Sequence, residues 1–467
     1  MFEFLIDDNK YSRIHFIGIG GISMSALAEI LVSEGYIVTG SDARDSLIIE
    51  RLRNFGATIY IGHSKDNLTN PDLIIYTDAI SKDNEEFITA HTLGVPVIDR
   101  ATFLGALMKN YKNSIAVSGT HGKTTTTSML STILNRSALN PTILLGGELD
   151  EIGGNVKLGS RDYILTEACE YKGNILKYFP TMAIILNIDE DHLDYFKSID
   201  HILDTFVEYG KNLKDDSYLL INGDDRGSKK VIDNTKARVF TFGIDGDWDY
   251  VAENISFSKE GYPSYTLRIR GEGRFRISLS VMGIHNVYNS LASVAAAHVY
   301  GIPMEDIQER ISIYTGVHRR LELKGYYKGV KIIDDYAHHP TEIKATLNAL
   351  RNSTTGAIYC VFQPHTYTRT KLLLNSFAES FVSADKVVIT DIYAAREKDN
   401  GLVHSKDLAN AIFDKGSDAI YLQTFQEVEA YLINNVKEND IIVTMGAGNI
   451  YMVGDSIIEN NKEKEAV

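Results

Sequence analysis

A phosphate-binding loop is indicated by the consecutive residues Gly119, Thr120, His121, Gly122, Lys123, Thr124 and Thr125. We expect a strand before it at 114–118 and a helix after it at 125–135, so that glycines and a helix N-terminus point backbone amides at phosphate oxygens. Lys123 can then neutralise the outer phosphates, while the Thr124 hydroxyl can bind Mg²⁺. The pattern is not a strict P-loop, because Val117 stands where its first glycine belongs. A tight turn with a solvated lysine is the alternative.

Two further strand ends carry groups that can hold a metal beside this loop. The apolar run at 163–166 ends in Glu167, and a second run at 183–186 precedes the segment from Asn187 to His192. Carboxylates on strand ends are typical Mg²⁺ ligands next to a phosphate loop. Histidine is unusual for Mg²⁺, so His192 can equally be a capping or core residue.

A second glycine-rich turn, Gly18-Ile19-Gly20-Gly21-Ile22-Ser23, follows an expected strand at 13–17. Asp42 closes the next strand. This spacing is similar to the dinucleotide-binding fingerprint, with Ser23 in place of its third glycine. A nicotinamide cofactor, another ligand with a diphosphate, and a turn without a ligand are all compatible with it.

The last third of the chain has two polar clusters, each after an expected strand. They are Asp334-Asp335-Tyr336-Ala337-His338-His339-Pro340-Thr341-Glu342 and Gln363-Pro364-His365-Thr366-Tyr367-Thr368-Arg369. Loops at the carboxyl ends of parallel strands commonly bind ligands. The pair Arg319-Arg320 precedes both clusters, and it is either a solvated linker or a charge clamp.

The elements that must position these residues alternate between strands and helices. In the first hundred residues we expect strands at 14–19, 36–39, 58–61 and 73–76, with helices at 25–34 and 48–55. The alternation restarts near 114 and again near 330, which predicts an α/β protein with mostly parallel sheets. We place domains at 1–108, 109–318 and 319–467.

Composition agrees with this division and excludes several classes of function. The 467 residues suggest about three domains, and 47 basic against 62 acidic residues give a net charge of −15. Such an acidic chain is a poor binder of nucleic acids or membrane surfaces. It has two cysteines, no apolar run long enough to span a bilayer and no signal-like start at 1–10, so we expect a cytoplasmic protein.

Taken together, the motifs resemble the Mur ligase family. The resemblance covers nearly the whole chain and includes the run His285-Asn286-Val287-Tyr288-Asn289. Within the family it is greatest to the branch that joins L-alanine to UDP-N-acetylmuramate. It implies a Rossmann-like N-terminal domain for the UDP-sugar, a central P-loop-type ATPase with a mostly parallel sheet, and a Rossmann-like C-terminal domain for the amino acid.

The resemblance also implies roles for individual residues. The ATP site would comprise Gly119, Thr120, His121, Gly122, Lys123, Thr124, Thr125, Asn286, Asn289, Arg320 and Asp335. The UDP-sugar site would comprise Gly18, Gly20, Gly21, Ser23, Ser41, Asp42 and His121. Thr124 and Glu167 would hold one Mg²⁺, and His192 would bind a second. The catalytic residues would be Lys123, Glu167, His192, His338 and Arg369, with Arg369 on the alanine carboxylate.

Two positions depart from the family's usual pattern. Cys169 stands where relatives often have an aspartate, and Thr366 where many have a second arginine. Other interpretations are a ligase that recycles an intact tripeptide, a nicotinamide-dependent oxidoreductase and a nucleotide-binding regulator without turnover. The sequence is compatible with a monomer or a dimer.

Overall fold

The computed structural model describes residues 2–8, 10–193, 195–395, 397–399 and 401–465. The chain divides into two units, and each is described here by itself. The first comprises the residues up to Ile188, Asp200–Phe242 and Ala295–Ile302, and the second comprises Asp189–Ile199, Gly243–Val294 and the residues from Pro303 on.

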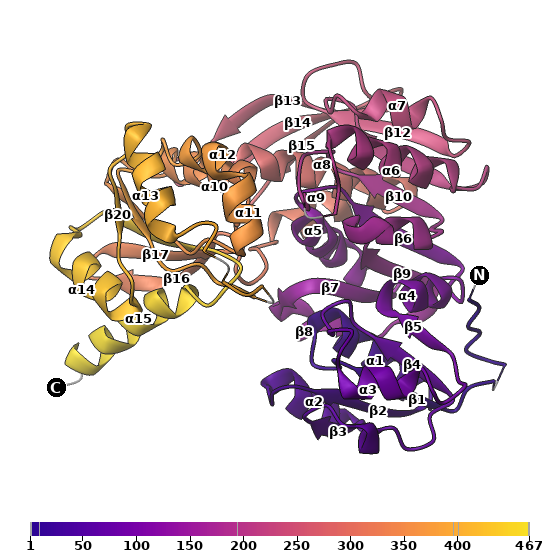
Figure 1. Ribbon diagram of the computed structural model, residues 1–467. Coiled ribbons are helices and arrows are strands. Elements are labelled where there is room, and N and C mark those ends of the chain that lie inside the picture. Colours follow the sequence, from indigo (N-terminus) through magenta and orange to yellow (C-terminus); the bar gives the residue numbers. More distant parts are fainter. Residues whose placement is uncertain (1, 9, 194, 396, 400, 466–467) are drawn as a thin grey trace. The chain divides into compact units, whose positions relative to one another are not determined.

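The first unit contains the following helices and strands, labelled in Figure 1: β1 (Arg13–Ile17), α1 (Ile22–Ser33), β2 (Ile37–Asp42), α2 (Leu47–Phe55), β3 (Thr58–Ile61), β4 (Leu73–Tyr76), α3 (Glu85–Ala90), β5 (Val97–Asp99), α4 (Arg100–Met108), β6 (Asn113–Ser118), α5 (Lys123–Asn135), β7 (Pro141–Leu149), β8 (Gly154–Lys157), β9 (Ser160–Glu167), β10 (Met182–Ile185), α6 (Ile199–Lys211), β11 (Tyr218–Asn222), α7 (Ser228–Ile232) and β12 (Arg238–Gly243).

The second unit contains β13 (Tyr250–Phe257), β14 (Pro263–Ile269), β15 (Gly273–Ser278), α8 (Ile284–Val299), α9 (Met304–Ser312), β16 (Glu322–Tyr327), β17 (Val330–Asp335), α10 (Pro340–Arg351), β18 (Ile358–Phe362), α11 (Tyr367–Leu372), α12 (Leu374–Ala378), β19 (Lys386–Ile389), α13 (Ser405–Asp414), β20 (Ala419–Tyr421), α14 (Phe425–Asn435), β21 (Ile441–Met445) and α15 (Tyr451–Glu465), the last turn of α8 belonging to the first unit.

The N-terminal sheet has the order β3-β2-β1-β4-β5, and all of its strands are parallel. Its central strand β1 is almost wholly buried, as expected when helices cover both faces of a parallel sheet. In the register, Ile17 at the end of β1 lies beside Ser41 and beside Tyr76. The turn after β1 and the end of β2 therefore share one edge of the sheet.

A second sheet of the first unit runs β12-β11-β10-β6-β9-β7-β8. These strands are parallel except for β8, which is antiparallel to β7. Val117 pairs with Glu167, and Ser118 pairs with Ile185. The register therefore brings the loop after β6 and the end of β9 to the same edge.

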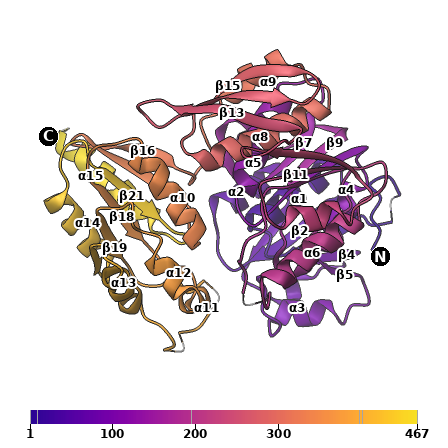
Figure 2. The same cartoon turned by 90° about the horizontal axis from the view of Figure 1, so that it is seen from above.

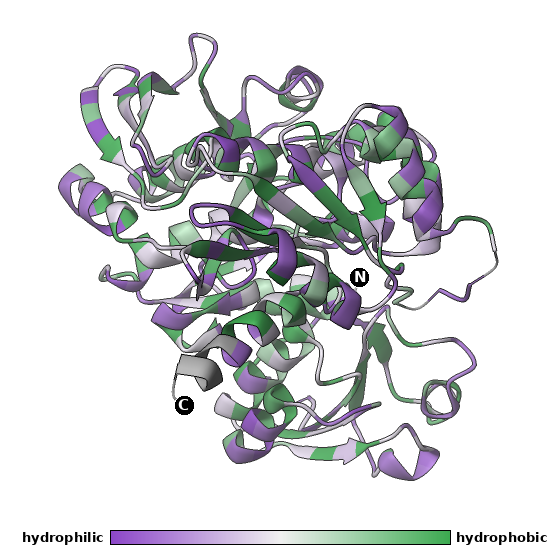
Figure 3. Ribbon diagram, turned by 90° about the vertical axis from the view of Figure 1, so that its left-hand side faces the viewer, coloured by the Kyte–Doolittle hydropathy of each residue, from purple (hydrophilic) through white to green (hydrophobic). Residues whose placement is uncertain are grey.

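The C-terminal sheet in the second unit runs β16-β17-β21-β18-β19-β20, and only β16 is antiparallel to its neighbour. Successive residues of its strands point to opposite faces. Helices α10, α12 and α13 pack on the face that holds Ile333 and Val443, and α14 and α15 pack on the face that holds Ile332 and Ile442. Figure 2 shows the helices on both sides of this sheet, and in Figure 3 many strands of the protein carry the green of hydrophobic residues. Three antiparallel strands, β13 to β15, also lie in this unit.

The expected alternation of strands and helices is confirmed, with shifts of a few residues at the ends. The strand expected at 14–19 ends at Ile17, because Gly18 has a φ of 83°. Helix α1 begins at Ile22, three residues before the expected start. Among the described residues no helix has the length and apolar character needed to cross a bilayer. Cys169 and Cys360 are free thiols.

Candidate nucleotide and sugar site

The loop between β6 and α5 has the backbone geometry of a phosphate-binding turn. Gly119 has a φ of 130° and Gly122 a φ of 84°, conformations that favour glycine. A Cβ at Gly119 would also press on Leu186 and Asn187, at 3.0 to 3.1 Å. Gly122 caps α5 without any side-chain hydrogen bond. The first amides of α5, which have no partner within the helix, are therefore available to an anion.

Asn187 fixes this loop from the neighbouring strand end. Its side-chain oxygen accepts a hydrogen bond from the His121 amide at 2.8 Å, and its side-chain nitrogen donates to the His121 carbonyl at 3.0 Å. Its own carbonyl accepts from the Thr120 amide at 3.1 Å. From the sequence, the run that begins at Asn187 is expected only to hold a metal. Its structural role in holding the loop emerges only from the folded chain.

Lys123 is held above the loop by main-chain and acidic partners. Its ammonium donates to the carbonyls of Gly119 and Thr120, at 2.5 and 3.0 Å, and lies 3.0 Å from a carboxylate oxygen of Glu170. Burial disfavours the charged ammonium, but Glu170 outweighs this effect and raises the pKa of Lys123 above its ordinary value. The side chain therefore carries a positive charge at neutral pH.

Two of the expected metal ligands, Thr124 after this loop and Glu167 at the end of β9, are in direct contact. The Thr124 hydroxyl donates to Oε2 of Glu167 at 2.9 Å, and the Gly146 amide donates to Oε1 at 2.6 Å. A hydroxyl and a carboxylate are hard oxygen donors of the kind that Mg²⁺ prefers. This donor set fits a magnesium ion beside the phosphate loop.

The glycine-rich turn after β1 is held by hydrogen bonds to the end of the neighbouring strand β2. The amides of Gly18 and Ile19 donate to the Ser41 carbonyl at 2.8 and 3.0 Å, and the Gly20 amide donates to Oδ2 of Asp42 at 2.9 Å. Gly21 caps α1 without a side-chain hydrogen bond. The expected UDP-sugar residues Gly18, Gly20, Gly21, Ser23, Ser41 and Asp42 thus lie around the ends of the neighbouring strands β1 and β2 and the start of α1.

A buried network around Glu86 is connected to this turn through Ser41, and it was not expected from the sequence. Glu86 contacts Nε2 of His15 and Nδ1 of His63, both at 2.9 Å, and accepts a hydrogen bond from the Ser41 hydroxyl at 2.5 Å. Burial alone would raise the pKa of Glu86, but His15, His63 and Ser41 lower it to about 2. No local motif marks this network, because its members lie up to 71 residues apart.

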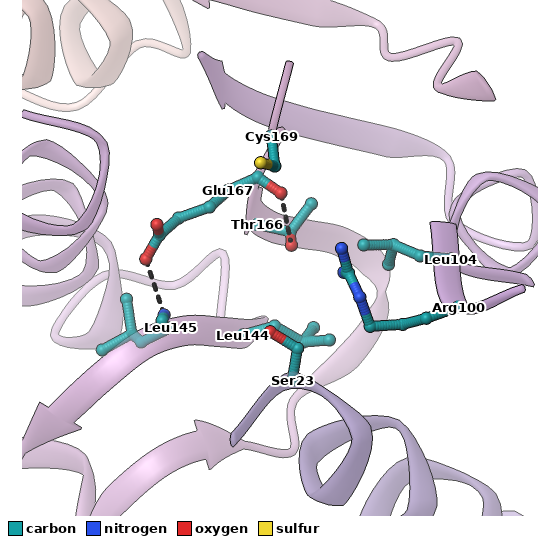
Figure 4. Close-up of a pocket in the computed structure, with 9 residues that line it drawn as sticks. Ser23, Arg100, Leu104, Leu144, Leu145, Thr166, Glu167 and Cys169 are labelled. Atoms are coloured by element: carbon teal, nitrogen blue, oxygen red, sulfur yellow. Dashed lines mark hydrogen bonds between the residues drawn. The ribbon is translucent and has the colours of Figure 1, made fainter. Parts of the chain in front are cut away.

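A pocket in the first unit connects the two sheet edges (Figure 4). It is lined by Ser23, Arg100, Leu104, Leu144, Leu145, Gly146, Thr166, Glu167 and Cys169. Ser23 comes from the start of α1, whereas Glu167 comes from the end of β9. One cavity therefore reaches from the expected sugar-nucleotide turn to the expected metal ligands. Arg100, which extends into it, was not among the expected site residues.

In the second unit, the expected amino-acid residues gather around Asp191. Arg369 donates to Oδ1 of Asp191 at 2.8 Å and contacts Nδ1 of His365 at 3.3 Å. Nε2 of His192 lies 3.8 Å from the other oxygen of Asp191. Burial would raise the pKa of Asp191, but His192 and Arg369 hold it well below its ordinary value. Asp194, at the end of the same motif, lies outside the described residues.

His338 lies in the same group and is neutral at pH 7. Burial and Arg369 lower its pKa to about 4, although Glu342 opposes the shift. Nδ1 lies 3.0 Å from the carbonyl oxygen of Tyr336. Since a carbonyl only accepts, Nδ1 carries the proton, and Nε2 is the ring's acceptor.

Three of the expected ATP-site residues, Asn286, Asn289 and Asp335, form hydrogen bonds within the protein. Asn289 donates to Asn286 at 2.9 Å, and Asn286 donates to the Met282 carbonyl at 2.7 Å. Asp335 accepts from the amides of Leu321 and Ala337, both at 2.8 Å. Burial raises the pKa of Asp335 to about 6, although Arg320 opposes the shift.

Arg319 and Arg320 are not a solvated linker. Arg319 donates to Asp334 at 3.1 Å and to the Gly446 carbonyl at 2.6 Å. Both guanidinium groups lie over the Tyr336 ring, at 4.9 and 5.1 Å from its centre. The expected ATP residues thus occur in both units, with Lys123, Thr124 and Glu167 in the first and Asn286, Asn289, Arg320 and Asp335 in the second.

The strand, phosphate loop and helix with an acidic strand end define a nucleotide-dependent enzyme of the P-loop type. Comparison with known protein families extends this conclusion over the whole chain. The model of the Mur ligase family catalytic domain matches residues 13–112, that of the Mur ligase middle domain matches 117–297, and that of the Mur ligase glutamate ligase domain matches 319–448.

Individual relatives agree with the family models. The UDP-N-acetylmuramate–L-alanine ligase of Caldanaerobacter subterraneus subsp. tengcongensis is 50% identical over 458 residues, which are 98% of this chain and 100% of the relative. Among solved structures, the UDP-N-acetylmuramate-alanine ligase MurC of Thermotoga maritima superposes with a TM-score of 0.82 at 30% identity, over 97% of this chain and 99% of the other. A murein peptide ligase of Psychrobacter arcticus gives a TM-score of 0.73 at 25% identity, over 96% and 98% of the two chains.

The chain therefore belongs to the Mur ligase family. The expected α/β fold of three domains is confirmed. The exact domain limits at 1–108, 109–318 and 319–467, like the roles of the individual site residues, stay predictions.

Proposed function

We propose that this protein joins L-alanine to the lactyl carboxylate of UDP-N-acetylmuramate at the expense of ATP. This would be the first stem-peptide step of peptidoglycan synthesis. The observation that carries the choice of substrates is the 50% identity, over 98% of this chain, to a UDP-N-acetylmuramate–L-alanine ligase. Membership of a ligase family argues against a nicotinamide-dependent oxidoreductase and against a regulator without turnover.

The first half of the reaction transfers the γ-phosphate of ATP to the substrate carboxylate, giving an acyl phosphate and ADP. The free amides at the start of α5 would bind the phosphates of ATP. Lys123 would exchange its contact with Glu170 for the outer phosphate oxygens, because a phosphate carries more charge than one carboxylate. Fixed positive charge around the transferred group is the main source of catalysis in such reactions.

Thr124 and Glu167 are the residues of the first unit that would hold Mg²⁺. When bound, the ion would offset negative charge on the phosphate oxygens. His192 remains the proposed ligand of a second ion. The chain's own contribution is to fix the two oxygen donors, and the Gly146 amide does so by orienting the Glu167 carboxylate.

The second half of the reaction uses the alanine amine, which attacks the acyl carbon and expels inorganic phosphate. Arg369 would bind the alanine carboxylate by a bidentate contact. For this, the guanidinium must share or release its present contact with Asp191. Neutral His338, with Nε2 as an acceptor, would accept a hydrogen bond from the alanine amine.

The proposal is tested by following phosphate release and the amide product with UDP-N-acetylmuramate, ATP, Mg²⁺ and L-alanine. We expect product only when all four are present. The proposal would fall if no product formed. Offering L-alanine and the L-alanyl-γ-D-glutamyl-meso-diaminopimelate tripeptide as alternative acceptors separates the proposed activity from that of a recycling ligase. A cytoplasmic location and an oligomeric state of monomer or dimer remain part of this proposal.

A further inference from the structure

Arg100 is a cation that the fold carries into the pocket of the first unit. It is the first residue of α4, directly after the capping residue Asp99. Figure 4 shows its guanidinium pointing into the cavity, toward the wall that holds Thr166 and Cys169. Gly105 on the same helix allows α4 to approach the 171–178 segment closely, because a Cβ there would overlap the Lys177 carbonyl. The position of Arg100 is thus set by the packing of its helix.

The charge of Arg100 is not matched by a carboxylate of the described chain. The nearby acids are bound elsewhere: Asp99 by Lys177 and Thr102, and Asp78 by Lys172 and Asn174. None of the described acidic residues forms an ion pair with Arg100, although the charge of Asp78 acts on it from a distance. A largely enclosed charge without a counter-ion is costly. Such a group points to an anionic ligand.

We propose that Arg100 binds the lactyl carboxylate of the sugar nucleotide and so selects substrates that carry it. This inference rests on the proposed function and adds a specificity residue to it. A planar guanidinium matches a carboxylate with two parallel hydrogen bonds. The carboxylate, rather than the diphosphate, is favoured because the guanidinium faces the wall at the end of β9, whereas Ser23 marks the glycine-rich turn expected to bind the diphosphate.

The surrounding charges explain why a cation is needed at this place. Glu167 lines the same pocket, so an approaching carboxylate meets negative charge there. Position 169 holds a free thiol rather than an acid. No ion pair within the described residues therefore competes with the substrate for the Arg100 guanidinium. A carboxylate bound there is held near the phosphate loop, where its activation has to occur.

The test measures binding of UDP-N-acetylmuramate and of UDP-N-acetylglucosamine, which lacks the lactyl carboxylate, by calorimetry without ATP or Mg²⁺. For the unmodified protein we expect UDP-N-acetylmuramate to bind about 10- to 100-fold more tightly, the usual value of a hydrogen-bonded charge pair. For Arg100→Gln we expect this preference to vanish, with the affinity for UDP-N-acetylglucosamine changed less than about twofold. Arg100→Lys should keep part of the preference.

Three results would overturn the inference: equal affinities in the unmodified protein, an unchanged preference in Arg100→Gln, or an equal loss of both ligands in that variant. The last would assign Arg100 to the shared diphosphate. Arg136→Gln, which removes an exposed ion pair with Glu151, serves as the control for loss of an arginine. Melting curves show whether each variant folds. Comparing the affinities of the two UDP-sugars in the unmodified protein tests the inference even if a variant does not fold. A protein that binds with the expected preference but forms no product with L-alanine would reject the proposed function alone.

Discussion

The first unit contains two turns of the same kind, with opposite charge around them. Each follows a buried parallel strand and leads into a helix capped by glycine without a side-chain hydrogen bond. At the turn after β1 the charged group in direct contact is Asp42, which accepts a hydrogen bond from the Gly20 amide. At the loop after β6 it is Lys123. The backbone shape therefore provides an anion site at both turns, and a single side chain determines whether phosphate charge is neutralised there.

Replacing Lys123 by Met should have the largest effect on activity, because it removes the positive charge that distinguishes the loop after β6 from the turn after β1. We expect turnover to fall by about 10³-fold or more, equivalent to about 4 kcal/mol of transition-state stabilisation. The measurement is ADP formation at saturating substrates. Lys157→Ala, on β8 of the same unit, is the control for the loss of a lysine and should retain activity. A Lys123→Met enzyme with more than a tenth of normal turnover would contradict the role assigned to this residue.

Glu86→Gln tests whether the first turn depends on the buried network beneath it. Because the folded-state pKa of about 2 lies below the ordinary value of 4.5, ionised Glu86 stabilises the fold above pH 4.5. This contribution is lost as pH falls from 4.5 toward 2. We expect the variant to lose about 3 kcal/mol of unfolding free energy at pH 7, measured by urea denaturation.

The same variant should flatten the decline in stability below pH 4.5. Glu85→Gln, one position earlier on α3, provides a matched control outside the network. Equal stabilities of the Glu86 variant and the unmodified protein at pH 7 would show that the network contributes nothing.

Thr124→Val tests the proposed metal ligands beside the loop after β6, which have no counterpart at the turn after β1. Valine keeps the shape of threonine but removes the hydroxyl that contacts Glu167. We expect the Mg²⁺ concentration for half-maximal activity to rise by about 10- to 100-fold. Thr124→Ser keeps the hydroxyl and should stay close to the unmodified protein. Identical magnesium titrations for the serine and valine variants would argue against a metal role.

Asp42→Asn is expected to have the smallest effect and to act on the other ligand. An amide accepts a weaker hydrogen bond than a carboxylate, so KM for UDP-N-acetylmuramate should rise by about tenfold. KM for ATP should stay unchanged, which initial-rate kinetics with each substrate varied in turn will show. A rise in both constants would mean that the two turns do not serve separate ligands.

Much of the fold could be predicted because periodic patterns are local. Apolar runs such as β1 and β6 appear in the sequence as strands, and Gly18 and Gly122 mark the ends where the backbone must turn. The first and last residues of helices are harder to predict than the presence of the helices. α1 begins at Ile22 rather than at 25, since a helix capped by glycine without a polar capping side chain gives little signal of its start.

The order of strands and helices, the two glycine-rich turns and the motif residues on them can be predicted from the sequence, because they depend on neighbours in the chain. Which distant groups meet is visible only in the folded protein. The fold places Thr124 against Glu167, Lys123 against Glu170 and Arg369 against Asp191. It also encloses Glu86 with two histidines and leaves Arg100 in the pocket without a carboxylate. These contacts between charged and polar groups depend on sheet register and helix packing, which bring together residues that no local sequence pattern relates.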